Sequence, residues 1–346
     1  MISLATSRVT DQMIANIMEA LSKNQIGGGD FVKLFEEKVA SFLGVKYAVA
    51  VTNGSMADII ALACLKHLYP KKTEVIVPAL TFIAHTNSVL VNGLKPVFVD
   101  VDLNCQIDVE KIREKITDDT LCIFPANLLG KECDMEVIMS LAKEYNIPVI
   151  EDSCEAFGIA PKGDFATYSF YPSHTITTGE GGMIATNSKE LYELAKKIRN
   201  HGRESDEILY KFHFDAIGFN GKMANIIAAI GCDSIDYASQ AIKSRRLNVE
   251  ALNGILGLNW HATSPHCYPM MYEDMIRRDM KLVELEDNGI EARKLFSCLP
   301  LEECYKDLGH KMGEFPVAEE IGRRGLFVPI HQDLSIDDIN KISGVL

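Results

Sequence analysis

The sequence predicts an α/β protein with a mainly parallel sheet that is covered by helices on both faces. Short apolar runs alternate with stretches of helical periodicity through about the first two thirds of the 346 residues. The runs are apolar at consecutive positions, which is typical of strands buried on both sides. Hydrophobic residues make up 47% of the chain and charged residues 24%, a balance that allows a large buried core.

Seven of these runs are expected to be strands. They span residues 47–52, 74–77, 96–99, 121–124, 148–151, 167–170 and 183–186. Helices are expected over residues 55–67, 84–91, 109–115, 135–145 and 189–200, with a long helical stretch over 222–255. The remainder mixes short strands and helices. We therefore expect a large α/β domain at residues 1–235 that packs closely on a small α+β domain at residues 236–346.

Composition excludes several classes of partner. The net charge of -13 argues against nucleic acid, because binding to phosphate backbones needs excess Lys and Arg. The most apolar stretch, residues 75–84, contains Pro78 and is shorter than the roughly 20 residues that cross a bilayer. The first residues do not resemble a signal peptide, and nine scattered cysteines favour a reducing compartment. We expect a cytoplasmic protein that binds no membrane.

Three segments place polar groups at the ends of expected strands. Asn53-Gly54-Ser55-Met56 separates a strand from a helix, where backbone N–H groups and a hydroxyl can cradle a phosphate, although a simple helix cap is the alternative. Another strand ends in Glu151-Asp152, whose carboxylate can hold a protonated ring nitrogen or belong to a surface acid pair. The third segment, 169–182, crosses a proline turn, carries His174 and becomes glycine-rich, which indicates a binding loop.

These segments and others in the same order resemble the sugar aminotransferase family of pyridoxal-phosphate (PLP) enzymes, the DegT/DnrJ/StrS group of fold type I, over essentially the whole chain. The motifs that carry the resemblance are Phe35-Glu36, Gly44-Val45-Lys46, Asn53-Gly54-Ser55, 77–82, 96–102, Ile150-Glu151-Asp152, 169–172, 177–183, Gly218-Phe219-Asn220 and 289–293. The resemblance implies that the larger domain binds the cofactor within a seven-stranded sheet sandwiched by helices.

The resemblance also implies a role for each matching residue. Gly54, Ser55 and Met56 would contact the cofactor phosphate, with assistance from Ser169. Phe82 would stack on the pyridine ring, Asp152 would pair with the ring nitrogen, and Glu155 would lie near the ring hydroxyl. Asn220 would reach the phosphate of a partner subunit, which implies a homodimer with shared active sites. These cofactor-binding residues are Gly54, Ser55, Met56, Phe82, Asp152, Glu155, Ser169 and Asn220.

The departure from the family pattern is His174. Most members have a lysine five residues after the serine that matches Ser169, and that lysine forms a Schiff base with the cofactor. Imidazole makes no such stable imine. The nucleotide-sugar 3-dehydratases share this change, in a Tyr-Pro-Ala-His segment similar to Tyr171-Pro172-Ser173-His174. There the cofactor is the amine form, pyridoxamine phosphate (PMP), and it is not covalently anchored.

This branch implies removal of the 3-hydroxyl from a nucleotide-linked 4-keto-6-deoxy sugar, in deoxysugar biosynthesis for a surface polysaccharide such as lipopolysaccharide or capsule. His174, with a pKa near neutrality, would act as general base and then as general acid. GDP-linked 4-keto-6-deoxy sugars are the expected substrate class, and the identities of the nucleotide and the sugar stay open. Two alternatives remain open. One is a perosamine synthase-like 4-aminotransferase whose lysine has been replaced, and the other is a non-catalytic paralogue that binds cofactor or sugar.

The cysteine pattern distinguishes two kinds of 3-dehydratase. One kind carries an iron–sulfur cluster, and the other regenerates its amine cofactor from glutamate. Cluster binding needs grouped thiolates, but the chain has no Cys-x-Cys or Cys-x-x-Cys. We therefore expect no cluster and no metal site, with glutamate as the amino donor. His85 and His213 receive no assigned role.

Overall fold

The computed structural model describes residues 1–204 and 212–346. Within these residues the seven expected strands form the order β1-β7-β6-β5-β4-β2-β3, because parallel bridges from Ile123 to Val149 and from Ala126 to Asp152 join a four-stranded and a three-stranded group. Only β7 runs antiparallel to its neighbours in the described sheet. The expected mainly parallel sheet is confirmed. The strands are β1 (Tyr47–Val51), β2 (Glu74–Pro78), β3 (Lys95–Val99), β4 (Thr120–Ile123), β5 (Ile150–Asp152), β6 (Phe165–Ser169) and β7 (Gly182–Thr186).

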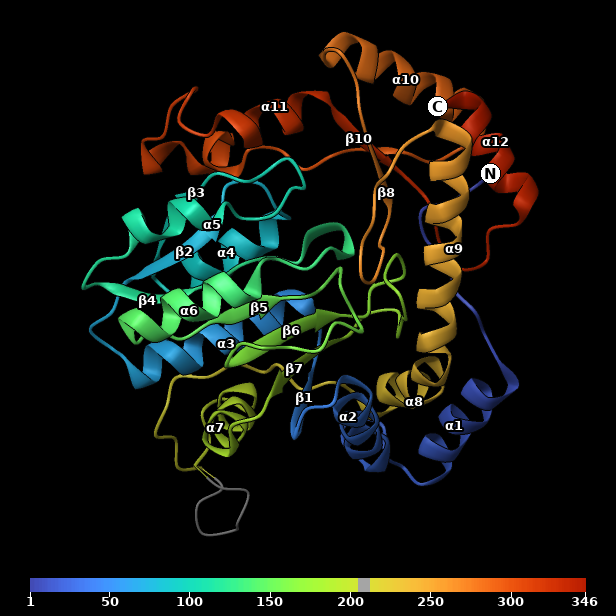
Figure 1. Ribbon diagram of the computed structural model, residues 1–346. Helices are drawn as coiled ribbons and strands as arrows, with labels where there is room; N and C mark the ends of the chain where they lie inside the picture. Colours follow the sequence, from blue (N-terminus) through green and yellow to red (C-terminus); the bar gives the residue numbers. More distant parts are fainter. Residues whose placement is uncertain (205–211) are drawn as a thin grey trace.

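Helices cover both faces of this sheet (Figure 1). Two successive residues of β1 point to opposite faces. Val49 packs in a cluster with α3, whereas Ala48 packs in a cluster with α2 and α8. The helices of this part are α1 (Asp11–Ser22), α2 (Asp30–Leu43), α3 (Gly54–Leu68), α4 (Ile83–Val91), α5 (Val109–Ile112), α6 (Met135–Tyr145), α7 (Lys189–Arg199) and α8 (Asn225–Ser234). Helices α1 and α2 were not among the expected elements.

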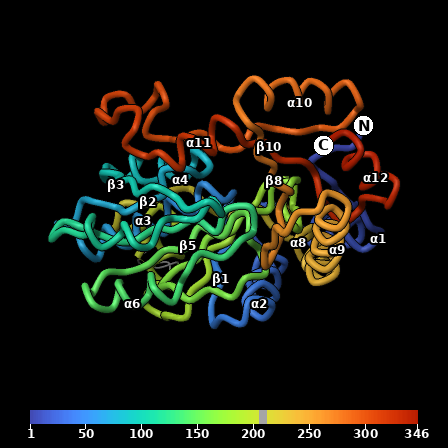
Figure 2. Tube along the Cα trace, turned by 45° about the horizontal axis from the view of Figure 1, so that its top comes forward, coloured from blue at the N-terminus to red at the C-terminus, as the bar shows by residue number. Residues whose placement is uncertain are grey.

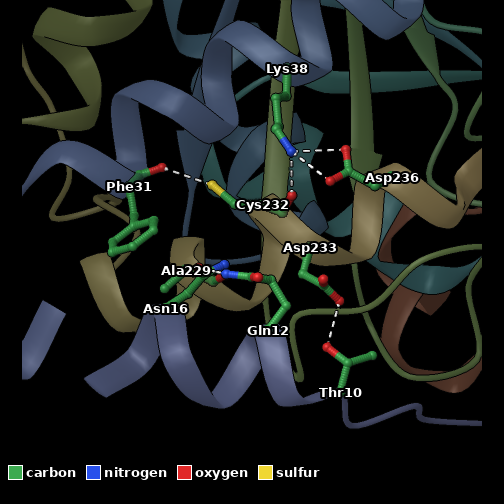
Figure 3. Close-up of polar contacts among 9 residues, drawn as sticks. All are labelled: Thr10, Gln12, Asn16, Phe31, Lys38, Ala229, Cys232, Asp233 and Asp236. Atoms are coloured by element: carbon green, nitrogen blue, oxygen red, sulfur yellow. Dashed lines mark hydrogen bonds and ion pairs between the residues drawn. The ribbon is translucent and has the colours of Figure 1, made fainter. Parts of the chain in front are cut away.

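Polar contacts fix these two N-terminal helices against α8 (Figure 3). Lys38 donates to the carbonyl of Cys232 at 2.7 Å and forms an ion pair with Asp236 at 2.8 Å. The amide of Asn16 donates to the carbonyl of Ala229 at 3.1 Å. The start of the chain is therefore part of the helical layer that packs on this face of the sheet.

The expected helical stretch over 222–255 is divided. Helix α8 ends at a 3-10 turn, Ile235–Tyr237, and α9 (Ala238–Leu256) continues to Gly257, whose left-handed φ of 67° terminates it. A small antiparallel sheet of order β8-β10-β9 follows with its helices. These elements are β8 (Tyr268–Met271), α10 (Met275–Asp287), β9 (Arg293–Lys294), α11 (Pro316–Arg324), β10 (Gly325–Val328) and α12 (Ile336–Val345).

Both ends of the chain lie beside this C-terminal part (Figures 1 and 2). We still propose a division into residues 1–235 and 236–346, although packing crosses it in both directions. Ile2 pairs with Ile290 and packs in the C-terminal hydrophobic cluster. Phe315 and Ile321 pack instead in the cluster around α3. Among the described helices, none combines the length and apolar character needed to cross a membrane.

A fully buried arginine on α9 ties the two parts together. The guanidinium of Arg245 donates to the carbonyls of His174 and His266, each at 2.9 Å, and to those of Ser173 at 3.3 Å and Pro265 at 3.4 Å. Its Nε donates to Gln332 at 3.0 Å. Burial lowers the Arg245 pKa to about 10, so the side chain stays charged at neutral pH. One cation thus holds the loop after β6 against the segment before β8.

Replacing Arg245 should weaken the fold strongly. Arg245→Met leaves several buried carbonyls without a donor, so we expect the free energy of unfolding to fall by about 3 kcal/mol or more. Chemical denaturation followed by circular dichroism measures this change. Arg246→Met is the matched control, because that neighbouring side chain is exposed and, among the described residues, donates to Thr263 alone. Equal losses for the two variants would contradict the role given to Arg245.

Candidate active site

A cavity of about 420 Å³ opens where β5 and β6 end and α3 begins. It gathers most of the residues that the sequence singled out, although they come from distant parts of the chain. Those that line it are Gly54, Ser55, Phe82, Asp152, Glu155, Ser169 and His174. Met56 and Asn220 do not line this cavity in the described chain. The predicted site residues therefore meet at one place, with two exceptions.

The N-terminus of α3 forms one end of the cavity, and the N–H groups at a helix N-terminus favour an anion. Gly54 lies against β6 so closely that a Cβ there would be 2.7 Å from Cβ of Ser169, so only glycine fits. The Ser55 and Ser169 side chains flank this point in the cavity lining. The Met56 N–H is already engaged, because it donates to the Oδ1 atom of the capping residue Asn53 at 2.8 Å. Gly54, Ser55 and Ser169 thus fit the predicted cradle better than Met56 does.

Asn220 lies away from this cavity. It lines a separate hollow of about 970 Å³ together with Gly28 and Lys33. Its backbone pairs with Asn200, beyond the end of α7. The reach of Asn220 into a partner's site stays a prediction.

Asp152, at the end of β5, lies beside a second buried acid. Asp58 extends from α3, and its carboxylate oxygen lies within 4.8 Å of a carboxylate oxygen of Asp152 and of the Cys154 Sγ atom. Thr167 donates to Asp58 at 2.6 Å. Burial, and then the negative charge of Asp152, raise the pKa of Asp58 well above its ordinary value. The neutral form of Asp58 is therefore favoured beside the Asp152 carboxyl group, which is the group that a ring nitrogen would meet.

Sequence reasoning missed Asp58. The available signal was an acid among the apolar residues of a helix whose positions 57, 60 and 61 are all buried. Cys154 beside it is a neutral thiol, because burial and the charge of Asp152 raise its pKa well above the ordinary value.

His85 also lines the cavity, and its backbone N–H donates to the carbonyl of Phe82 at 3.1 Å. Its ring stacks on that of Phe124 at a centroid distance of 3.9 Å, and neither ring nitrogen has a hydrogen-bond partner among the described residues. Burial lowers its pKa to about 4, so the ring is neutral at pH 7. His213, in contrast, is exposed, pairs with Glu204 and does not line the cavity.

His174 lies in the loop after β6, with its Nδ1 atom enclosed and without a hydrogen-bond partner in the described structure. The backbone N–H of His174 donates to the carbonyl of Tyr171 at 2.9 Å, and its backbone carbonyl accepts from Arg245. Burial and the positive charge of Arg245 lower the His174 pKa to about 3. The expected pKa near neutrality is therefore wrong, because the sequence reveals neither the burial of the ring nor the neighbouring cation of Arg245.

Glu155 and a second histidine complete this wall. Glu155 accepts a hydrogen bond from the N–H of Leu129 at 2.7 Å, and its Oε1 atom is 3.7 Å from Nε2 of His266. The ring centroids of His266 and His174 are 5.0 Å apart. Burial raises the Glu155 pKa to about 7. Sequence reasoning missed His266, which follows Pro265 in the C-terminal part and belongs to no motif.

The cavity fits a pyridine ring that carries a phosphate. Phe82 is 55% exposed toward the open space and contacts Phe296 edge-to-face at 6.2 Å, so one ring face is available for stacking. The helix end at Gly54 suits a phosphate, and the Asp152 carboxyl group suits a protonated ring nitrogen. No lysine lines the cavity among residues 1–204 and 212–346. The nearby Lys162 pairs instead with Glu132 at 2.8 Å.

The fold and this cavity define a PLP-dependent enzyme of fold type I. Residues 8–346 match the DegT/DnrJ/EryC1/StrS aminotransferase family, and the chain belongs to that family. The GDP-perosamine synthase of Escherichia coli O157:H7 is 35% identical over 90% of this chain and 88% of its own length. The GDP-4-keto-6-deoxy-D-mannose 3-dehydratase of Escherichia coli O55:H7 is 29% identical over 99% of this chain and 98% of its own.

Solved structures agree with this assignment. A GDP-4-keto-6-deoxymannose-3-dehydratase with a trapped PLP-glutamate geminal diamine has a TM-score of 0.92 and 27% identity over the full length of both chains. A histidine-to-asparagine variant of such a dehydratase with bound GDP-perosamine has a TM-score of 0.92 and 28% identity, again over both full lengths. The expected family, fold type and PLP cofactor are confirmed.

The Glu155 pKa makes a prediction about stability. The folded pKa of about 7 lies above the unfolded value of about 4.3, so the folded state holds the extra proton between these values and loses stability as pH rises through this window. Glu155→Gln removes that loss. We expect the variant to gain about 2 kcal/mol relative to wild type between pH 5 and pH 8 in urea denaturation without added cofactor.

The control is Glu136→Gln, which changes an exposed acid on α6. Its difference from wild type should not depend on pH. A Glu155→Gln difference that is equally independent of pH would contradict the raised pKa.

Proposed function

We propose that this protein is a PMP-dependent 3-dehydratase of a nucleotide-linked 4-keto-6-deoxy sugar. The observation that carries the proposal is His174, which occupies the position of the family's lysine in a cavity that no lysine lines among the described residues. Without a lysine amine, the chain has no group there that can anchor the cofactor covalently or shuttle protons as aminotransferases do. Imidazole retains only the acid–base half of that role.

The residues of the cavity divide the work of holding the cofactor. We assign Gly54, Ser55 and Ser169 to its phosphate, Phe82 to its ring face, Asp152 to its ring nitrogen and Glu155 to the neighbourhood of its ring hydroxyl. Met56 is not assigned to the phosphate, because its N–H is engaged by Asn53. When bound, the cofactor supplies an amine that condenses with the sugar's keto group and a ring that withdraws electrons. Glutamate would restore the amine after each turnover.

The electrostatics of His174 suit it to move one proton. Its low pKa keeps the ring neutral at pH 7, so a ring nitrogen is free to accept a proton from the carbon beside the cofactor amine, and the same low pKa makes the ring a weak base. The imidazolium that results is destabilised by Arg245 and therefore gives the proton up readily. Delivery to the oxygen of the departing 3-hydroxyl makes that group leave as water.

A 4-aminotransferase is the second candidate. It is favoured by the GDP-perosamine synthases of Escherichia coli O157:H7 and Caulobacter vibrioides, which are 35% and 33% identical to this chain. GDP-4-keto-6-deoxymannose is therefore the first substrate to test for both activities. Incubation with this sugar, PLP and glutamate, followed by mass spectrometry, distinguishes loss of the C3 oxygen from gain of an amino group.

Exchange of the histidine should exchange the products. Wild type is expected to release ammonia and a 3-deoxy product, whereas His174→Lys should form amino sugar and lose at least about 100-fold in 3-deoxy product, because proton transfer by the imidazole is gone. His174→Asn controls for simple loss of the base and should do neither. Brisk amino-sugar formation by His174→Lys, with no 3-deoxy product from wild type, would instead establish the aminotransferase.

We also propose a homodimer with shared sites, because Asn220 faces a hollow separate from its own subunit's cavity. His174→Ala and Asn220→Ala should each be inactive alone. Coexpressed in equal amounts, half of the dimers are hybrids with one intact site, so about a quarter of wild-type activity should return. No recovery in a mixture that size-exclusion chromatography shows to be dimeric would contradict the shared site.

A further inference from the structure

His266 is fixed in the cavity wall by the backbone around it. The segment before β8 lies along the 3-10 turn at Leu128–Gly130. The backbone N–H of Ser264 donates to the carbonyl of Gly130 at 3.0 Å, and the backbone N–H of His266 donates to that of Leu129 at 3.1 Å. A Cβ on Gly130 would lie 1.7 Å from the Ser264 carbonyl oxygen, so the two strands of chain are in close contact. The His266 side chain is 9% exposed. Its position is therefore determined by the fold.

Three ionisable side chains form a row along this wall. The Oε1 atom of Glu155 is 3.7 Å from Nε2 of His266, and the His266 ring centroid is 5.0 Å from that of His174, with the rings inclined at 44°. The Nδ1 atoms of both histidines are buried and have no hydrogen-bond partner among the described residues. The second torsion of a histidine side chain is broad, so a modest ring rotation can bring these nitrogens to hydrogen-bonding distance.

We propose that His266 is a second proton-transfer residue of this site and connects His174 to Glu155. The inference rests on the proposed dehydratase function and deepens it. A proton accepted by His174 passes to one ring nitrogen of His266, while the proton on the other ring nitrogen moves to the Glu155 carboxylate. The net change is one proton moved from His174 to Glu155, with both imidazoles neutral again and no electrons exchanged. The reverse transfer returns the proton to His174 for the departing hydroxyl.

The charges around the row favour this direction. Burial disfavours a positive charge on the His266 ring, and so do the neighbouring His174 and Arg245. Together they hold the pKa of His266 well below its ordinary value. Glu155, which faces Asp152 as well as His266, has a pKa raised to about 7 by burial and is the strongest base of the three. A proton on Glu155 removes a buried negative charge, whereas a proton on either ring adds a positive charge beside Arg245. Of the three groups, the Glu155 carboxylate therefore binds the proton most tightly.

Steady-state kinetics of the holoenzyme give the first test, with GDP-4-keto-6-deoxymannose as substrate. We expect His266→Asn to lower kcat about 100-fold with little change in KM, because proton transfer is lost while the substrate still binds. Wild-type activity should rise with pH through about 7 as Glu155 ionises, and this rise should be absent in Glu155→Gln. His331→Asn is the matched control, since His331 is a buried histidine of the same part of the chain that does not line the cavity.

Chemical rescue separates proton transfer from a purely structural role. His266→Ala with added imidazole should recover at least about 10-fold in kcat, whereas the control variant should not respond. A fully active His266→Asn with an unchanged pH profile would overturn the relay and leave the dehydratase proposal intact.

A spectroscopic measurement tests the same link without turnover. In cofactor-free protein labelled with ¹⁵N-histidine, the ring nitrogens of His174 should shift in His266→Asn and in Glu155→Gln, but not in His331→Asn. Unchanged His174 resonances in both of the first two variants would overturn the proposal. If wild type forms no 3-deoxy sugar, the dehydratase function fails, and these resonances alone then decide whether the row is connected.

Discussion

The buried guanidinium of Arg245 is the interaction on which the rest of the site depends. It takes part in both the architecture and the electrostatics, because a single planar group donates to carbonyls on either side of the cavity wall. Those carbonyl acceptors are neutral, so they stabilise the guanidinium by hydrogen bonds but do not cancel its positive charge. The same contacts that place His174 and His266 near each other therefore also disfavour protonation of both rings. Geometry and proton chemistry have a common cause here.

The cavity contains few net charges although the chain as a whole is acidic. Burial, and then the neighbouring Asp152, favour the neutral form of Asp58, and burial favours the neutral form of the His266 ring. Anionic groups of a cofactor or substrate must therefore be met locally. The N–H groups at the start of α3 and the side chain of Arg293, which also lines the cavity, can meet them. The net charge of -13 is consequently no obstacle to binding a nucleotide-linked sugar.

The sequence was most informative where burial follows local pattern. Strands such as 74–77 and helices such as 135–145 were predicted to within a residue or so, because apolar runs and capping residues such as Asp134 are local signals. The antiparallel direction of β7 was not predictable in this way, because it depends on which partners the strand meets. The expected helix over 222–255 failed at Ile235–Tyr237, where no Gly or Pro marks the break.

The same distinction applies to the site. Gly54, Asp152 and Ser169 lie at strand or helix ends that the sequence itself locates, so their convergence followed from the topology of a parallel sheet. Asp58 and His266 belong to no motif, and only the tertiary structure brings them to the cavity. The predicted pKa of His174 was wrong for a related reason. Burial in the folded protein lowers this pKa first, and then Arg245, which lies 71 residues further along the chain on a helix that no sequence pattern placed beside it.

This environment also explains how one scaffold can carry either a histidine or a lysine at position 174. Burial and a neighbouring cation lower the pKa of any basic group, whether imidazole or amine. An amine held neutral is a nucleophile that can form a Schiff base, and an imidazole held neutral is a proton acceptor. Arg245 would therefore prepare both residues for their different reactions. Under the proposed function, a lysine-to-histidine exchange would alter the chemistry without requiring a new electrostatic setting, and this chain is similar to both aminotransferases and a 3-dehydratase.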